Sequence, residues 1–272
     1  MINISKQDFL NLINEYKVNH HEGLLLLSQI LQLSYSELFF KKYFEISEDE
    51  LKLLKSYLSR RQNKEPIAKI IEQKEFYGIT YKTTRNTLDP RPETELIIDL
   101  FLTYYKDKNL KLNILDLGCG TGCIGLSILN LYENITCDFV DISENALKIA
   151  KENAKNLNLL NRANFYTSNW FSNIKSQYDI IVSNPPYISR DYKLDQETFY
   201  DPEIALFSEN EGMADITYII SNASNFLFSN GMLFIEIGFD QGKKIKNIKT
   251  KLKFIKIEKD LANIERIAIF RL

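Results

Sequence analysis

The segment Asn184-Pro185-Pro186-Tyr187 places an amide, two prolines and an aromatic ring directly after an apolar run. Because proline has a fixed φ and no backbone N–H, carbonyl groups here can face a ligand without competing donors beside them. The side-chain oxygen of Asn184 and the carbonyl oxygen of Pro185 could each accept one hydrogen of a planar NH2 group, with Tyr187 over its flat face. The alternative is an ordinary proline turn after a strand. The residue types favour a site for a planar amide or amine.

Such a site suits the transfer of a group to nitrogen. An amide nitrogen is a poor nucleophile because its lone pair is delocalised, and acceptors that hold both hydrogens would return electron density to it in the transition state. Transfer then depends mainly on in-line positioning and needs no strong base. The only histidines, His20 and His21, lie near the amino terminus and fit surface or packing positions.

A glycine loop, Asp116-Leu117-Gly118-Cys119-Gly120-Thr121-Gly122, marks a second candidate site. Glycines allow a sharp turn and close approach of a ligand at the carboxyl edge of a sheet. Asp141 ends the next predicted strand, where its carboxylate could accept hydrogen bonds from ribose hydroxyls. The run from Gly120 to Gly125 also matches the dinucleotide fingerprint, which leaves an NAD-dependent oxidoreductase as an alternative. Asp116, two residues before the glycines, could instead bind a cationic amino-acid group, and the loop resembles the signature of seven-strand S-adenosylmethionine methyltransferases.

Strand and helix patterns alternate after Lys111, which predicts a parallel sheet covered on both faces. The last two strands are joined too briefly for a helical crossover, so we expect them to form an antiparallel hairpin. The expected helices are 124–131, 144–158 and 216–228. The expected strands are 112–117, 135–140, 164–167, 178–182, 232–237, 254–257 and 266–270.

The chain before this α/β region has a different sequence pattern. Apolar residues recur at helical spacing as far as about Gln73, and Ser47 with Glu50 forms a capping-box pattern. Aromatic and β-branched residues around Gly78 predict a short hairpin. We expect a helical domain over 1–73, a β-hairpin linker over 74–90 and an α/β domain over 91–272.

Composition limits the other classes of function. The 272 residues carry a formal net charge of −2, which gives no support for stable nucleic-acid binding. The amino terminus does not resemble a secretory signal, and no apolar run reaches bilayer length. The three cysteines favour reduced thiols in the cytoplasm. Cys119 and Cys123 lack further suitable ligands nearby, so we expect no metal site.

These motifs together resemble the PrmC/HemK family of release factor glutamine methyltransferases over nearly the whole chain. The resemblance includes Phe76-Tyr77-Gly78, the glycine loop, Asn184-Pro185-Pro186-Tyr187, and Glu236-Ile237-Gly238 with Asp240-Gln241-Gly242. It implies a class I, seven-stranded Rossmann-like domain that binds S-adenosyl-L-methionine and yields S-adenosyl-L-homocysteine. It also implies a helical domain that helps to dock class-1 peptide-chain release factors, and methylation of the glutamine in their Gly-Gly-Gln loop.

The resemblance implies roles for individual residues. Asn184, Pro185 and Tyr187 are expected to be catalytic, and Pro186 completes the glutamine pocket. Arg91 and Glu93 could face the substrate, although a place at a helix start fits them equally. Relatives often carry Thr and Ser at the positions of Cys119 and Thr121, and Asp at that of Asn169. The expected cofactor residues are Asp116, Gly118, Cys119, Gly120, Thr121, Gly122, Asp141, Ile142, Trp170 and Asn184.

Besides the oxidoreductase, three further alternatives to the leading hypothesis stay open. The exocyclic amine of adenine in DNA or RNA offers the same two donors, but duplex DNA would require base flipping and a basic surface. A glutamine of a ribosomal protein is a second possible substrate. The third is a non-catalytic docking protein. We expect a monomer that does not bind membranes.

Overall fold

The computed structural model describes all residues 1–272, and the chain divides into two compact units. One unit comprises 1–72 together with 195–200, and the other comprises 73–194 together with 201–272. No helix in either unit combines the length and apolar character needed to cross a bilayer.

The smaller unit is mainly helical, as expected, and has a core of its own that includes Phe9, Leu24 and Leu58. Ser47 and Glu50 form the predicted capping box at the start of its longest helix. Two short strands that the sequence analysis missed pair antiparallel, with Ile2 opposite Ile46. The elements are β1 (Ile2–Ser5), α1 (Lys6–Glu15), α2 (His20–Leu31), α3 (Tyr35–Phe40), β2 (Tyr43–Ile46), α4 (Glu48–Gln62) and α5 (Ile67–Ile71).

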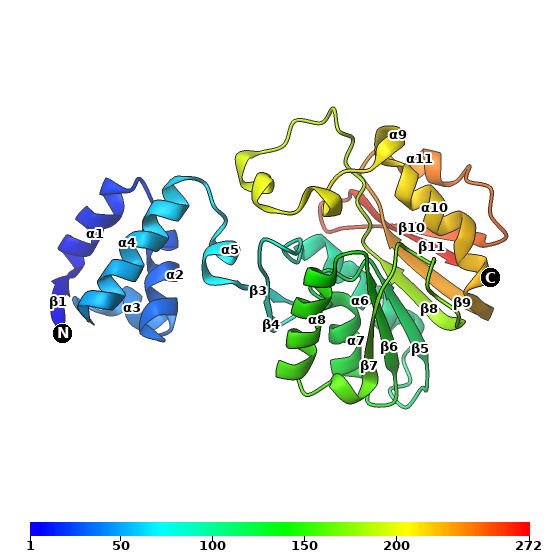
Figure 1. Ribbon diagram of the computed structural model, residues 1–272, viewed down its shortest axis with the longest axis horizontal. Helices are drawn as coiled ribbons and strands as arrows, with labels where there is room; N and C mark the ends of the chain where they lie inside the picture. Colours follow the sequence, from blue (N-terminus) through cyan, green and yellow to red (C-terminus); the bar gives the residue numbers. More distant parts are fainter. The chain divides into compact units, whose positions relative to one another are not determined.

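The larger unit is built on a seven-stranded sheet with the order β10-β11-β9-β8-β5-β6-β7 (Figure 1). Strands β5 to β9 run parallel, and β11 and β10 complete one edge with antiparallel pairing, as predicted. The strands are β5 (Asn113–Leu117), β6 (Thr136–Asp141), β7 (Ala163–Thr167), β8 (Tyr178–Ser183), β9 (Leu227–Glu236), β10 (Lys253–Lys259) and β11 (Glu265–Arg271).

Helices cover both faces of this sheet because successive strand residues point to opposite sides. Ile114 and Ile180 pack in the core with α6, α7 and α8, whereas Leu115 and Ile181 pack with α10 and α11. The expected α/β fold is therefore confirmed. The helices are α6 (Glu95–Tyr104), α7 (Cys123–Leu131), α8 (Glu144–Asn156), α9 (Glu209–Gly212), α10 (Ala214–Asn222) and α11 (Gly242–Ile245).

One predicted helix is too long. The expected helix over 216–228 ends at Asn222, and β9 already begins at Leu227. The Tyr178 N–H donates to the Phe226 carbonyl at 2.9 Å, and the Asn230 N–H donates to the carboxyl-terminal Leu272. These contacts with residues distant in the chain draw the segment into the sheet, and local periodicity carries no information about them.

The predicted hairpin is present as β3 (Gln73–Phe76) and β4 (Ile79–Lys82). It forms part of the larger unit rather than a separate linker, because Phe76 and Tyr81 are buried in that unit's core. The segment 195–200, expected within the α/β domain, instead groups with the helical unit. Within that unit Arg61 pairs with Glu197 at 2.8 Å, and the Tyr200 hydroxyl donates to the Asn63 carbonyl.

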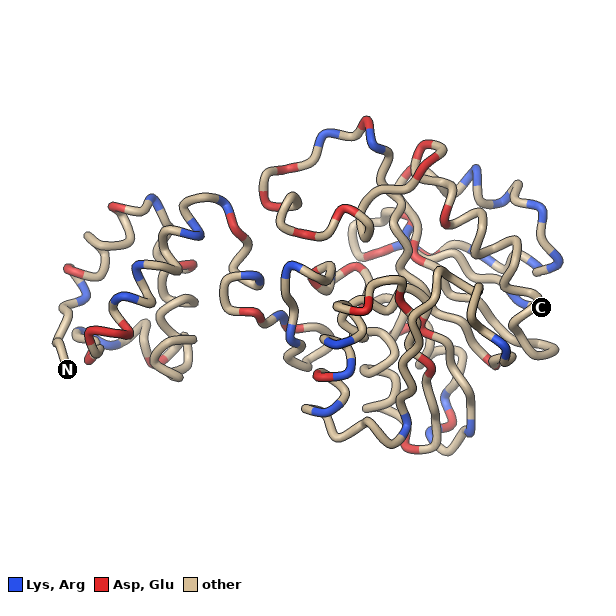
Figure 2. The backbone as a smooth tube through the Cα atoms, in the orientation of Figure 1, with Lys and Arg blue, Asp and Glu red and all other residues tan.

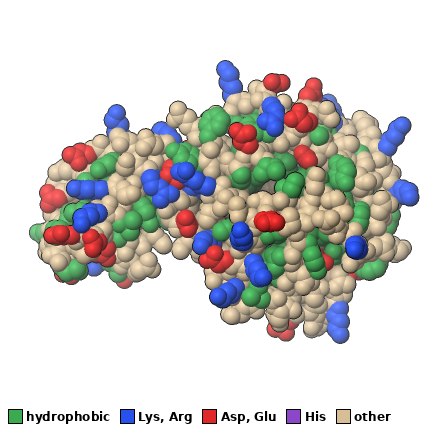
Figure 3. Space-filling view, in the orientation of Figure 1, with side chains coloured by type: hydrophobic (Ala, Val, Ile, Leu, Met, Phe, Trp, Pro, Cys, Tyr) green, Lys and Arg blue, Asp and Glu red, His purple; other side chains and the backbone are tan.

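Charges are mixed along the chain (Figure 2). The lysine-rich segment 243–256 is the main basic run, and Lys244 in it pairs with Glu211 at 2.6 Å. On the face shown in Figure 3, acidic and basic side chains are interspersed over both units. That face shows no broad surface of one sign.

Candidate active site

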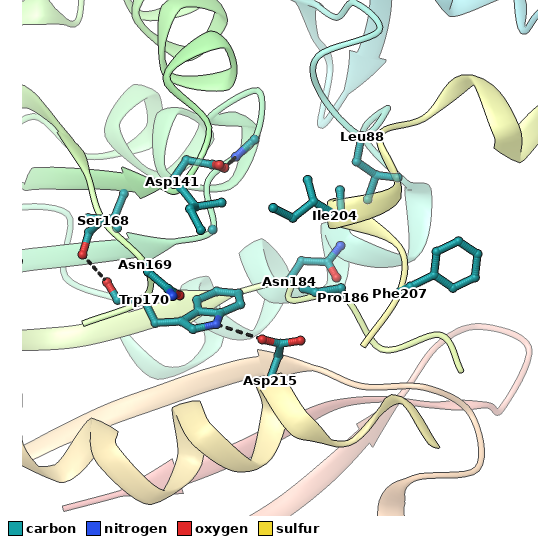
Figure 4. A pocket seen from close by; sticks show the side chains of 15 residues that line it. Leu88, Asp141, Ser168, Asn169, Trp170, Asn184, Pro186, Ile204, Phe207 and Asp215 are labelled. Carbon is teal, nitrogen blue, oxygen red and sulfur yellow. Dashed lines mark hydrogen bonds between the residues drawn. The ribbon is translucent and has the colours of Figure 1, made fainter. Parts of the chain in front are cut away.

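A pocket opens in the larger unit at the carboxyl ends of β5, β6 and β8 (Figure 4). In open parallel sheets this edge is where ligands bind. Its wall includes residues of both predicted sites, together with residues that no motif indicated. The lining residues are Leu88, Gly118, Gly120, Val140, Asp141, Ile142, Ser168, Asn169, Trp170, Asn184, Pro186, Ile204, Ala205, Phe207 and Asp215.

The glycine loop between β5 and α7 is held by backbone hydrogen bonds. The N–H groups of Gly118 and Cys119 both donate to the Val140 carbonyl, at 2.8 and 2.9 Å. Gly118 has a φ of +76°, and a Cβ there would lie 3.0 Å from the Trp170 ring. Both facts require glycine at this position, because side chains strain the left-handed conformation and the ring leaves no room.

Asp141, at the end of β6, faces the pocket with a carboxylate that the backbone orients. One oxygen accepts from the Gly120 N–H and the other from the Ser143 N–H, each at 2.9 Å. Burial raises the pKa of Asp141, and the backbone hydrogen bonds oppose that shift. The carboxylate retains lone pairs that can accept hydrogen bonds from hydroxyl groups in the pocket.

Four predicted cofactor residues do not line this pocket: Asp116, Cys119, Thr121 and Gly122. Asp116 is fully buried, and one of its oxygens accepts from the Gly125 N–H in the first turn of α7 at 2.9 Å. Its other oxygen has no hydrogen-bond partner, and burial raises the pKa of this carboxyl to about 7. Asp116 is thus joined to the start of α7 from behind the loop, and its expected contact with a ligand stays a prediction.

Trp170 forms one wall of the pocket, next to Gly118. Its indole N–H donates to Asp215 at 2.9 Å, and its carbonyl accepts from the Ser168 hydroxyl at 2.8 Å (Figure 4). Asp215 also accepts from the Ser208 hydroxyl at 2.6 Å. Asp215 lies 45 residues from Trp170 and matches no spacing rule, so no local motif indicated it.

The Asn184 segment follows β8 and is held mainly by side chains. The Asn184 amide donates to the Thr94 hydroxyl at 3.1 Å, and that hydroxyl donates to Glu236 at 2.6 Å. The Tyr187 hydroxyl donates to the other oxygen of Glu236 at 3.2 Å, and burial raises the pKa of Tyr187. Asn184 and Pro186 line the pocket, whereas Pro185 and Tyr187 do not.

The backbone of Tyr187 is also held by the side chain of Gln241, an arrangement called the clamp below. Gln241 is buried, and its side-chain NH2 group donates to the carbonyls of Tyr187 and Gly212, each at 3.1 Å. Its side-chain oxygen accepts from the Gly238 N–H at 2.8 Å. A Cβ on Gly212, which has a φ of +80°, would lie 2.1 Å from the Tyr187 carbonyl oxygen. These contacts account for Gln241 in the Asp240-Gln241-Gly242 motif, whose role could not be read from the sequence.

Arg91 and Glu93 lie outside the lining of this pocket. Arg91 forms an ion pair with the buried Asp201 at 2.6 Å, and Glu93 is exposed within the short 3-10 helix Pro92–Thr94. Their neighbour Thr94 makes the connection to Asn184 that the sequence analysis did not foresee.

Comparisons with known proteins agree with this architecture. The family model of the PrmC N-terminal domain matches residues 14–71, and that of the methyltransferase small domain matches residues 94–201. The release factor glutamine methyltransferase of Buchnera aphidicola subsp. Schizaphis graminum is 39% identical over 91% of this chain and 90% of its own length. That of Coxiella burnetii is 36% identical over 99% and 96%. The bifunctional methyltransferase of Rickettsia typhi is 38% identical over 84% of this chain and 48% of its own length.

Solved structures support the fold alone. The hMettl16 catalytic domain, in complex with an RNA hairpin, is 12% identical with a TM-score of 0.57, over 79% of this chain and 81% of that chain. The methyltransferase SMU.776, complexed with SAH, is 14% identical with a TM-score of 0.51, over 74% and 56%. The sequence relatives decide the family and remove the oxidoreductase alternative. With its Asn184 segment, its glycine loop and relatives matched almost end to end, this chain belongs to the PrmC family of release factor glutamine methyltransferases.

Proposed function

We propose that this enzyme transfers a methyl group from S-adenosyl-L-methionine to the side-chain amide nitrogen of the glutamine in the Gly-Gly-Gln loop of class-1 release factors. The names of its relatives support this substrate. The observation that carries the proposal is the orientation of Asn184 in the pocket. Because its NH2 group is engaged by Thr94, its oxygen is the atom available to accept a hydrogen bond from a substrate.

The residues present fit S-adenosylmethionine, whose sulfonium supplies an electrophilic methyl group. Asp141 would accept hydrogen bonds from the ribose hydroxyls, and Gly118 and Gly120 leave room for close approach of the loop backbone. Trp170 and Ile142 supply apolar surface beside them. These residues lie in the same pocket as Asn184, so a methyl donor and an acceptor nitrogen could meet there.

In this proposal the protein contributes to the reaction by positioning the glutamine NH2 group. The Asn184 oxygen would hold one hydrogen of the glutamine NH2 group, and the Pro185 carbonyl would hold the other. Pro186, which lines the pocket, would confine the planar amide; the roles proposed for Pro185 and Tyr187, which do not line it, require the substrate site to extend beyond this pocket. Acceptors on both hydrogens favour positive charge developing on the nitrogen as the new bond forms, so no side-chain base is required.

We further propose that the unit formed by 1–72 helps to dock the release factor, and that the enzyme acts as a monomer in the cytoplasm. Mixed surface charge gives no support for stable nucleic-acid binding. Three free, buried cysteines fit a reducing compartment.

The test is to incubate the purified protein with labelled S-adenosylmethionine and, separately, a release factor, ribosomal proteins, or DNA and RNA. We expect label on the release factor, located to the Gly-Gly-Gln glutamine by mass spectrometry. A release factor with Gln replaced by Glu in that loop is the matched control. Label in nucleic acid or ribosomal protein alone would overturn the proposal in favour of the corresponding alternative.

A further inference from the structure

Glu236 is a buried carboxylate behind Asn184, outside the lining of the pocket. It ends β9 with 1% of its surface exposed and forms no ion pair. Its two oxygens accept hydrogen bonds from Thr94 and Tyr187, at 2.6 and 3.2 Å. Two hydrogen bonds offset only part of the cost of burying a carboxylate that has no ion-pair partner, so its location calls for a reason other than stability.

The direction of these hydrogen bonds determines how Asn184 is oriented. A hydroxyl has one proton, and an ionised carboxylate can only accept, so Thr94 must give its proton to Glu236. Thr94 can then only accept from Asn184, which turns the Asn184 NH2 group toward Thr94 and leaves the side-chain oxygen for the substrate. The reversed amide would present donors to the donors of the substrate.

We infer that Glu236 is a positioning residue for methyl transfer: through the Thr94 hydroxyl it keeps the acceptor oxygen of Asn184 directed at the substrate nitrogen. This inference rests on the proposed function, because it assumes an NH2 group beside Asn184. Glu236 does not line the pocket and acts through its neighbours. The same carboxylate holds the Tyr187 hydroxyl, so one group supports both side chains of the motif.

Protonation of Glu236 would remove the constraint on which way the Asn184 amide faces. A protonated carboxyl can donate to Thr94, whose own proton is then free to stabilise the reversed Asn184 amide. Burial raises the pKa of Glu236 to about 7, and the hydrogen bonds from Thr94 and Tyr187 oppose the shift. Of the charged groups around it, Arg266 on β11 lowers the pKa and Glu93 raises it. Cys123 at the start of α7 also interacts with Glu236, and burial raises its own pKa to about 12, so its thiol stays neutral.

The direction of the pH dependence of turnover follows from the raised pKa of Glu236. The ionised, directing form predominates above about pH 7, so turnover should fall as the pH is lowered through that value. Glu236→Gln should lower kcat about 10- to 100-fold at pH 8, with a small change in KM, because misplacing a reacting group costs rate more than binding. The remaining activity of the variant should lack the titration near pH 7.

The experiment measures kcat and KM from pH 6 to 9 with the release factor, alongside S-adenosylhomocysteine affinity and circular dichroism as checks of folding. Thr94→Val removes the hydroxyl that links Glu236 to Asn184, here called the relay, without much change in side-chain shape. Thr94→Ser restores a hydroxyl. We expect Val to reproduce the loss of kcat and Ser to recover most of it. Glu258→Gln on β10, which removes a carboxylate paired with Lys256, is the matched control and should leave kcat unchanged.

A second readout needs no substrate. The side-chain amide NMR signals of Asn184, assigned with Asn184→Ala, should shift with a midpoint near pH 7 in the wild type and not in Glu236→Gln. A folded Glu236→Gln variant with wild-type kcat, or Asn184 signals that ignore Glu236, would overturn the inference. If the wild type labels no release factor while the NMR titration is as expected, the proposed substrate fails and the relay stands.

Discussion

The glycine-loop side of the pocket is held by the backbone, whereas the Asn184 side is held by side chains from several segments. Gly118 donates its N–H to the Val140 carbonyl and Gly120 donates its N–H to the Asp141 carboxylate, 22 and 21 residues further along the chain. Asn184 depends on Thr94 and Glu236, which lie 90 residues before it and 52 residues after it. A wall held through backbone N–H groups tolerates side-chain changes that keep its backbone conformation, whereas a network of side chains does not. The two sides should therefore respond differently to substitution.

The largest effect is expected on the Asn184 side. Asn184→Ala removes the acceptor oxygen, and we expect kcat to fall about 100-fold or more, by analogy with the loss of one transition-state hydrogen bond. Affinity for S-adenosylhomocysteine, measured by calorimetry, should change little. Unchanged turnover would remove Asn184 from the mechanism.

On the opposite wall, Gly118→Val should act through conformation and space. The positive φ costs about 1–3 kcal/mol for a residue with a side chain, and the Cβ would press on Trp170. We expect S-adenosylhomocysteine affinity to fall about tenfold, equivalent to about 1.4 kcal/mol. Cys119→Thr in the same loop is the control and should alter affinity little, because Cys119 is bound through its N–H. Equal losses in both variants would contradict a backbone-held wall.

A smaller effect is expected at the clamp on Tyr187. Gln241→Leu leaves the carbonyls of Tyr187 and Gly212 and the Gly238 N–H without their partner, so the free energy of unfolding should fall by about 1–3 kcal/mol. Urea denaturation measures this change. Gln177→Leu, which removes one hydrogen bond at an exposed position, should cost much less. A stability loss no larger than that of Gln177→Leu would show that the clamp is weak.

Asp116 behind the loop should affect how stability depends on pH rather than how the pocket works. Its folded-state pKa of about 7 is raised above the ordinary carboxyl value, so the folded state holds its proton more tightly than the unfolded state does. Between about pH 4 and 7 ionisation therefore makes stability fall as the pH rises. The Tm of Asp116→Asn minus that of the wild type should grow from pH 5 to pH 8. A concurrent loss of S-adenosylhomocysteine affinity would instead place Asp116 in contact with the ligand.

The strands were predicted to within a few residues wherever an apolar run was short and bounded by polar residues, as at Asn113–Leu117 and Thr136–Asp141. The prediction was wrong at 216–228, where pairing with β8 and the chain end converts the last residues to strand. Strands β1 and β2 were missed because each has four residues and pairs only with the other, about 40 residues away.

The local sequence was sufficient to identify the motifs of the site, because the residues of each motif lie together on one turn after a strand. Gly118, Gly120, Asp141, Ile142, Trp170, Asn184 and Pro186 all line the pocket. Tertiary structure alone decided what holds them: Thr94 and Glu236 behind Asn184, Asp215 behind Trp170, and Gln241 behind Tyr187. A turn is specified by the φ and ψ preferences of neighbouring residues, whereas the partner of a buried polar group is whatever the packed sheet and helices bring within hydrogen-bond distance.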